Sequence, residues 1–167
     1  CSQHVSPNDH VNFGQSSNDV IPTTIHVSAA LAIDKELMPA LSHLISVINA
    51  KAESVHDYIK TGRTHLMDAM PVRMSQSLHA WADQLKQHIE ALKQLQKPLT
   101  TLAQGGTAVG TGINTHAHFS QLFSDSISAA TDQSFKPANN FFTHIGSQDI
   151  IVSVSGQLKS VAVSIMK

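Results

Sequence analysis

The chain has 167 residues, enough for a domain of ordinary size with a substantial buried core. Hydrophobic residues make up 41% of it and charged residues 14%, a composition that excludes a disordered tail. Lys and Arg number 11 and Asp and Glu 12, so the formal net charge of -1 gives no overall attraction to nucleic acid or to an anionic membrane.

The single cysteine, Cys1, excludes an intrachain disulfide framework and a zinc site built from cysteines. No apolar run approaches the roughly 20 residues of a membrane span, and no signal peptide opens the chain. We therefore expect a reduced compartment, the cytoplasm, or the mitochondrial matrix in a eukaryote. The chain lacks an initiator Met, and an apolar periodic pattern continues to its last residues, so we expect a piece of a longer protein, incomplete at both ends.

The predicted elements are mainly long helices. Residues 1–19 are a polar loop that ends in helix-capping residues, and apolar residues at three- and four-residue steps then predict a helix over 20–59 with a kink at Pro39. Residues 60–73 are predicted to be a loop, and the same periodicity predicts a second helix over 74–103. Helices of this length predict an all-α fold with a long bundle core.

The second half of the chain is more irregular. Four of the eight residues in 105–112 are Gly, which predicts a Gly-rich loop over 104–116. A short helix and a connection rich in Pro and Asn are predicted over 117–147, and a truncated helix over 148–167. Five histidines on predicted helices are expected to lie on polar faces: His26, His43, His56, His79 and His88.

Three polar loops carry residues suited to chemistry. The first places hydroxyls and an amide at a helix start, which suits a carboxylate or phosphate, or serves only to cap the helix. The second, residues 62–68, combines Arg63, His65 and Asp68 as a general acid/base with anion-holding neighbours, or as a surface turn with an Arg–Asp pair. The third is the Gly-rich loop, which allows close approach to a ligand or to a neighbouring helix, or merely breaks a helix.

Two other kinds of site are not supported. The Gly-rich loop lacks a Gly-Lys-Ser/Thr ending and no strand precedes it, so a nucleotide-binding loop is excluded. His116 and His118 would share a metal on a strand but diverge near a helix start, and we predict no metal site.

Taken together, three ordered segments resemble class II fumarase, of the fumarase/aspartase superfamily. The segments are residues 8–12 with 15–19, residues 62–65 with 68–69, and residues 105–115 (Gly-Gly-Thr-Ala-Val-Gly-Thr-Gly-Ile-Asn-Thr). The resemblance covers nearly the whole chain, but the chain covers only about the middle third of the usual length of that family. His65 and Gly106 resemble fumarase more closely than aspartase.

The resemblance implies the all-α central domain of that family, assembling around a multi-helix core as a homotetramer whose active sites are shared between subunits. It implies a lyase, a fumarate hydratase that interconverts fumarate and L-malate in the tricarboxylic acid cycle with no metal or organic cofactor. The residues implied are His65 for catalysis, Ser16, Ser17, Asn18 and Thr64 for substrate binding, and Asn8 and Asp9 for a second anion site.

The implied chemistry matches these residue types. Removing a proton beside a carboxylate builds a doubly charged aci-carboxylate, which preorganised donors at helix ends would stabilise. A histidine that titrates near neutral pH would pass the water-derived proton.

The chain also departs from the family. Ser6 and Met67 stand where His and Gln are usual, and Ser75 and Ser77 stand where Gly and Glu are usual. The family's Gly-Ser-Ser loop and its upstream Ser-Gly-Thr segment lie outside the chain, so we expect the 167 residues alone to be inactive. Two alternatives stay open: an enzyme like aspartate ammonia-lyase, and a non-catalytic helical oligomerisation fragment.

Overall fold

The computed structural model describes residues 4–166, so Cys1 lies outside the described residues. The chain divides into two compact units. The first joins Cys1–Ala32 to Leu95–Ser155, and the second joins Ile33–Gln94 to Gly156–Lys167. Each unit is described by itself below, and a single central domain over 1–167 stays a prediction.

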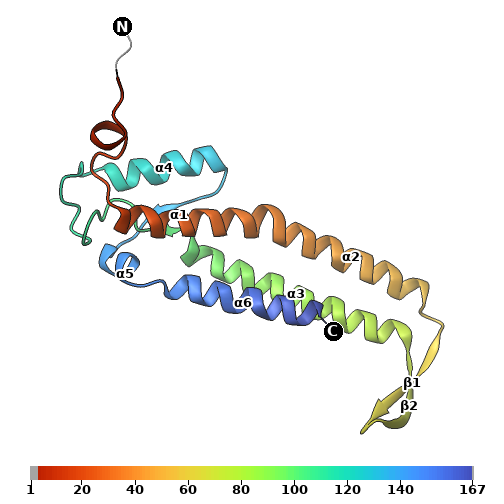
Figure 1. The fold of residues 1–167 in the computed structure, drawn as a ribbon. Coiled ribbons are helices and arrows are strands. Elements are labelled where there is room, and N and C mark those ends of the chain that lie inside the picture. The colour runs from red at the N-terminus through yellow and green to blue at the C-terminus, as the bar shows by residue number, and fades with distance from the viewer. Residues whose placement is uncertain (1–3, 167) are drawn as a thin grey trace. The chain divides into compact units, whose positions relative to one another are not determined.

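The first unit packs short elements around one helix (Figure 1). Its elements are η1 (Pro7–Val11), α1 (Ser17–Ala32), β3 (Thr101–Leu102), α4 (Phe119–Thr131), β4 (Lys136–Pro137) and α5 (Phe141–Gly146). The ends of α3 (Met74–Leu99) and α6 (Asp149–Ile165) that fall within Leu95–Ser155 complete it. The strands β3 and β4 pair in parallel, with Thr101 opposite Lys136.

The predicted helix over 74–103 was therefore too long, because α3 ends at Leu99. Pro98 lies in its last turn, and the chain beyond it takes extended hydrogen bonds instead. The N–H of Lys136 donates to the carbonyl of Thr100 at 3.1 Å, and the N–H of Ala138 donates to that of Leu102 at 2.9 Å. Strand pairing with a distant segment thus replaces the helical hydrogen bonds, which local periodicity could not reveal.

In the second unit, helical segments flank a hairpin. Its elements are η2 (Ile33–Leu37), α2 (Met38–Ser54), β1 (Ile59–Thr64), β2 (Met67–Arg73) and the remaining parts of α3 and α6. The predicted helix over 20–59 begins earlier, at Ser17, contains a π-helical turn at Ile33–Leu37 and ends at Ser54. Pro39 lies in the first turn of α2, where its missing N–H costs little, and the irregular turn comes just before it.

Residues 60–73 are not the predicted loop but an antiparallel β-hairpin. Its register shifts between Thr61 and Arg63, so Gly62 forms a bulge, where a Cβ atom would lie 2.6 Å from the carbonyl oxygen of Met70. In Figure 1 the hairpin extends beyond the ends of α2 and α3. The sequence did not predict it because nearly all of its side chains are exposed, so no alternation of apolar and polar residues marks the strands.

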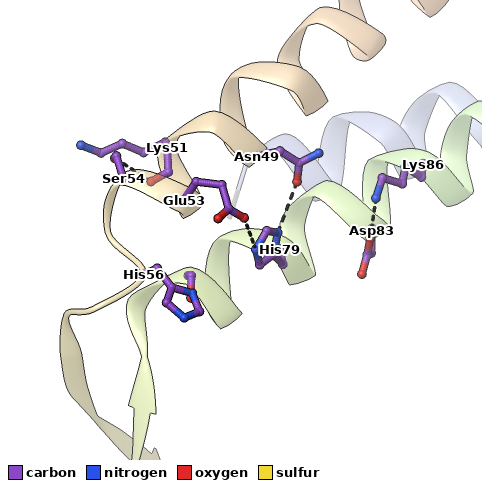
Figure 2. Close-up of polar contacts among 9 residues, drawn as sticks. Asn49, Lys51, Glu53, Ser54, His56, His79, Asp83 and Lys86 are labelled. Carbon is purple, nitrogen blue, oxygen red and sulfur yellow. Dashed lines mark hydrogen bonds and ion pairs between the residues drawn. The ribbon is translucent and has the colours of Figure 1, made fainter.

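Much of the apolar stripe predicted for α3 forms the buried side of that helix, although Trp81 is 47% exposed. In the second unit it buries Leu85, Ile89 and Leu92. Figure 2 shows His79 of α3 facing α2, with Nδ1 at 3.3 Å from Asn49 Oδ1 and Nε2 at 3.6 Å from Glu53 Oε1. His88 joins α3 to α6 in the same unit, because its Nε2 lies 2.8 Å from Ser164 Oγ.

Helix α1 buries polar side chains and exposes apolar ones, the reverse of an ordinary amphipathic helix. Its buried residues are Asp19, Pro22, Thr23, His26 and Ala30, at three- and four-residue steps. Ile21 and Ile25 lie on the other side and are 56% and 38% exposed. His26 was expected on a polar face, but the polar face of α1 is the buried one: His26 is 3% exposed, and Nδ1 donates to the carbonyl of Leu99 at 2.9 Å. Within residues 4–166, no helix has both the length and the apolar character needed to cross a bilayer.

The burial of His26 predicts acid sensitivity. Burial lowers the pKa of His26 below its ordinary 6.5, and nearby His144 lowers this pKa further, against the raising effect of the Leu99 carbonyl. Below about pH 6.5 the unfolded chain therefore binds a proton that the folded chain resists, so the free energy of unfolding should fall with decreasing pH. Denaturant titrations of the full-length protein at a series of pH values between about 7.5 and 5 measure this slope.

A matched pair of variants isolates the effect. His26→Gln should flatten the decline in the free energy of unfolding below about pH 6.5, even if it lowers stability at every pH. His43→Gln, which replaces an exposed histidine of α2, should leave the decline unchanged. Equal slopes for wild type and His26→Gln would contradict the prediction.

Candidate functional site

The amino end of α1 is closed by a reciprocal cap. The hydroxyl oxygen of Ser16 accepts the N–H of Asn18 at 3.2 Å, and the N–H of Ser16 donates to Asp19 Oδ1 at 2.9 Å. Helix capping, one of the two interpretations of this loop, is thus confirmed. Ser17 and Asn18 stay exposed beside this cap. A helix amino end carries partial positive charge, so the exposed side chains lie where an anion is favoured.

Asp19 connects this helix end to the Gly-rich loop. Its side chain is completely buried, and Oδ2 accepts the N–H of Gly105 at 3.1 Å and that of Thr107 at 2.8 Å. The amide of Asn18 adds a contact by donating to the carbonyl of Ala108 at 2.7 Å. The first and third segments of the sequence therefore form one structure. Sequence reasoning gave Asp19 only a capping role, because nothing local signals a partner 86 residues away.

The glycines of the loop let helices approach it closely. A Cβ atom on Gly105 would lie 2.6 Å from the Cβ of Ser120 in α4, and one on Gly106 would lie 2.6 Å from Ile145 Cδ1 in α5. Gly105 also has a φ of +104°, which L side chains rarely adopt. The expectation of close approach to a neighbouring helix is confirmed at both positions.

A cavity of about 510 Å³ opens between these segments. Its polar lining residues are Asn8, Asn12, Gln15, Ser16, Thr107 and Asn114. Among the described residues, no carboxylate and no cation lines it. Amide and hydroxyl donors beside a helix amino end favour a small ligand that is rich in hydrogen-bond acceptors.

The segment predicted to form a second anion site contributes one of its two named residues to the wall of this cavity. Asn8 lines it, whereas Asp9 does not. The hydroxyl of Ser6 donates to Asp9 Oδ2 at 2.9 Å, and its oxygen accepts the N–H of Asp9 at 3.2 Å. The N–H of Ser6 also donates to His10 Nδ1 at 2.9 Å. The serine that stands in place of the usual histidine is therefore used in local turn contacts.

Thr64 and His65 lie in the second unit, at the tip of the hairpin. Both side chains are exposed, and His65 and Leu66 form a two-residue turn with φ values of +50° and +62°. Arg63 Nε lies 3.6 Å from Asp68 Oδ1, so the Arg–Asp pair of the surface-turn interpretation is present. The structure thus brings Asn8 and Ser16 to one cavity, with Ser17 and Asn18 at the same helix end, and puts Thr64 and His65 in the other unit.

His116 and His118 precede α4 rather than lying on a strand. Their ring centroids are 5.5 Å apart, and the N–H of His118 donates to His116 Nδ1 at 3.2 Å. In the part of the chain that the structure describes, three or more His, Cys, Asp or Glu residues nowhere gather in a way that could hold a metal ion.

Comparison with known proteins agrees with this structure. A Pseudomonas aeruginosa protein named fumarate hydratase class II 2 is 58% identical over 163 residues, which cover 98% of this chain and 36% of that protein. The fumarate hydratase class II of Thermus thermophilus is 45% identical over 166 residues and is covered to 36%. A crystal structure of class II fumarase from Schistosoma mansoni superposes with a TM-score of 0.94 at 36% identity, over 99% of this chain and 38% of that one.

These matches confirm the resemblance to class II fumarase and the mainly helical fold, while the chain spans a little over a third of the length of these relatives. The family model described as lyase matches residues 1–167. The chain therefore belongs to the lyase family.

Proposed function

We propose that the full-length protein containing this chain is a fumarate hydratase that interconverts fumarate and L-malate. The observation that carries the proposal is the helix end of α1, held by Asp19 against the Gly-rich loop beside a cavity of neutral donors. Relatives named fumarate hydratase class II support the choice of substrate. The reaction belongs to the tricarboxylic acid cycle, and the bacterial relatives support the cytoplasm as its compartment.

In the proposed site, Ser16, Ser17 and Asn18 bind one substrate carboxylate. Ser16 accepts a hydrogen bond from the backbone, so its own proton is free to donate, and the side chain of Ser17 is exposed. One N–H of the Asn18 amide already donates to the carbonyl of Ala108, which fixes the amide and orients its second N–H. Donors fixed before the ligand arrives stabilise the charge that builds up on the aci-carboxylate without reorganising.

Thr64 would complete the carboxylate contacts, and His65 would move the proton of the attacking or departing water. The resemblance to class II fumarase implies active sites shared between subunits, so the proposal joins these two residues with Ser16–Asn18 in such a site of a homotetramer. An apolar groove in the second unit supports this assembly: it has a volume of about 290 Å³ and is lined by Leu44, Ile48, Leu85 and the exposed Trp81 and Ile165.

Asn8 and Asp9 are proposed to belong to a second anion site next to the first. Asn8 supports it through its place in the cavity wall. Asp9 would contribute only by holding the turn through its two hydrogen bonds with Ser6, since its N–H already donates to Ser6 and its carboxylate repels an anion.

The test is an assay of the purified full-length protein with fumarate and, separately, with aspartate. Formation of L-malate from fumarate supports the proposal. Release of ammonia from aspartate without hydration of fumarate would replace it with an aspartate ammonia-lyase, and activity on neither substrate would favour a non-catalytic protein. Light scattering of the same sample measures the mass of the assembly, and a monomeric mass would contradict the shared site.

A further inference from the structure

Thr107 stands out in the cavity wall because its hydroxyl has no partner. The side chain is 3% exposed, and Oγ1 makes no hydrogen bond within the described part of the chain. Burying a hydroxyl without a hydrogen bond costs free energy, so such groups in native proteins call for an explanation. The residue lines the same cavity as Ser16 and Asn8.

The backbone of Thr107 holds the side chain in this place. Its φ is +58°, a conformation that β-branched residues very rarely adopt. The N–H donates to the buried carboxylate of Asp19 at 2.8 Å, which fixes the strained residue. Gly105 and Gly110 on either side also have positive φ, but they are glycines and adopt it without strain. Backbone strain and an unpaired buried hydroxyl at one residue both lower the stability of the fold, and such features cluster at sites where the group binds a ligand.

Thr23 offers a comparison within the same unit. Its Oγ1 is also buried and without a partner, and the side chain is also 3% exposed. Thr23, however, lies in the middle of α1, in ordinary helical backbone, and does not line the cavity. Among residues 4–166, only Thr107 combines an unpaired hydroxyl, a strained backbone and a place beside the donors of the proposed carboxylate site.

We infer that the hydroxyl of Thr107 is a ligand-binding group that donates a hydrogen bond to a carboxylate oxygen of a small acid bound in this cavity. The inference deepens the proposed function and rests on it for the identity of the acid. The ligand oxygen supplies the partner that the fold leaves out, and the surrounding wall of amides and hydroxyls, free of carboxylates among the described residues, accommodates its charge.

The experiment compares four forms of the full-length protein: wild type, Thr107→Val, Thr107→Ser and Thr23→Val. Valine has the shape and β-branching of threonine, so the backbone strain is unchanged and only the hydroxyl is lost. Each form is assayed over a range of fumarate concentrations, and its melting temperature is measured with and without L-malate. The second readout reports binding even if turnover is absent.

We expect Thr107→Val to raise KM about 10- to 100-fold, as for the loss of one hydrogen bond to a charged group, with a much smaller change in kcat. Its rise in melting temperature with L-malate should shrink, while without ligand it should melt no lower than wild type because an unpaired buried hydroxyl has been removed. Thr107→Ser keeps the hydroxyl and should bind nearly as wild type does. Thr23→Val should leave KM and the L-malate effect unchanged.

Wild-type binding by Thr107→Val would overturn the inference, as would an equal loss in Thr23→Val. If Thr107→Val does not fold, Thr107→Gly takes its place, since glycine accepts the positive φ and also lacks the hydroxyl. Wild-type protein that binds L-malate but does not hydrate fumarate would refute the proposed function alone, and the melting data would still decide the role of Thr107. Absence of both hydration and L-malate binding in wild type would refute both.

Discussion

Replacing His65 with alanine in the full-length protein should lower kcat for fumarate hydration by roughly 10²–10⁴-fold, the usual contribution of a positioned acid or base. The side chain is exposed at the tip of the β1–β2 hairpin, so its loss removes no packing within the described chain. Steady-state kinetics with fumarate and with L-malate should show the loss in both directions, because the same group takes the proton in one and returns it in the other.

His65→Asn serves as the matched control for the backbone. Asn tolerates positive φ better than most residues, so it suits the +50° that His65 adopts in the turn while removing the imidazole. A loss of rate equal to that of His65→Ala would assign the effect to the lost ring rather than to a disturbed turn. Unchanged turnover in either variant would remove His65 from the mechanism.

Asp19→Asn should be the most damaging conservative change at the helix end. The carboxylate accepts three N–H groups, from Ser16, Gly105 and Thr107, and an amide can offer only one oxygen to them. At least one buried N–H then faces an NH₂ group, so we expect the free energy of unfolding to fall by about 2–4 kcal/mol. Denaturant titration measures the loss, and amide hydrogen exchange at Gly105 and Thr107 should become faster.

Asp34→Asn is the control, because Asp34 is an exposed carboxylate in η2. A surface change of this kind should alter stability by less than about 0.5 kcal/mol. Equal effects of the two substitutions would show that Asp19 does not hold the Gly-rich loop on α1.

The helices were largely predictable because their signals are local. The apolar steps of α3 predicted the stripe that buries Leu85, Ile89 and Leu92. The β-hairpin and the β3–β4 pairing were not predictable from such signals. The hairpin exposes nearly all its side chains. The strand β3 forms only because the N–H groups of Lys136 and Ala138, far along the chain, donate to the carbonyls of Thr100 and Leu102. The burial of His26 was not predicted for a related reason, because a helix that buries polar residues shows no hydrophobic periodicity on its buried face.

The candidate site was predictable as a set of loops but not as a geometry. The segments 8–12 and 15–19 predicted Asn8 and Ser16 as site residues, and the two do line one cavity. Thr107, which lines that wall, and Asp19, which binds the N–H of Thr107 from behind it, carried no local sign of their role. The sequence alone indicates only a helix cap for Asp19 and only a turn for Thr107. Their roles follow from hydrogen bonds that Asp19 accepts from residues 86 and 88 positions away.

The reversed polarity of α1 matters to anyone who tries to engineer this chain. A common route to better-behaved protein is to exchange surface aliphatic residues for lysine or glutamate and interior hydroxyls for leucine. Applied to α1, that route would replace the exposed Ile21 and Ile25 with charged residues. It would also replace Thr23, on the same buried side as Asp19 and His26, with leucine. The helix would then match the pattern of an ordinary amphipathic helix, but it would lose the polar contacts that hold the Gly-rich loop and the exposed apolar side that carries Ile21 and Ile25.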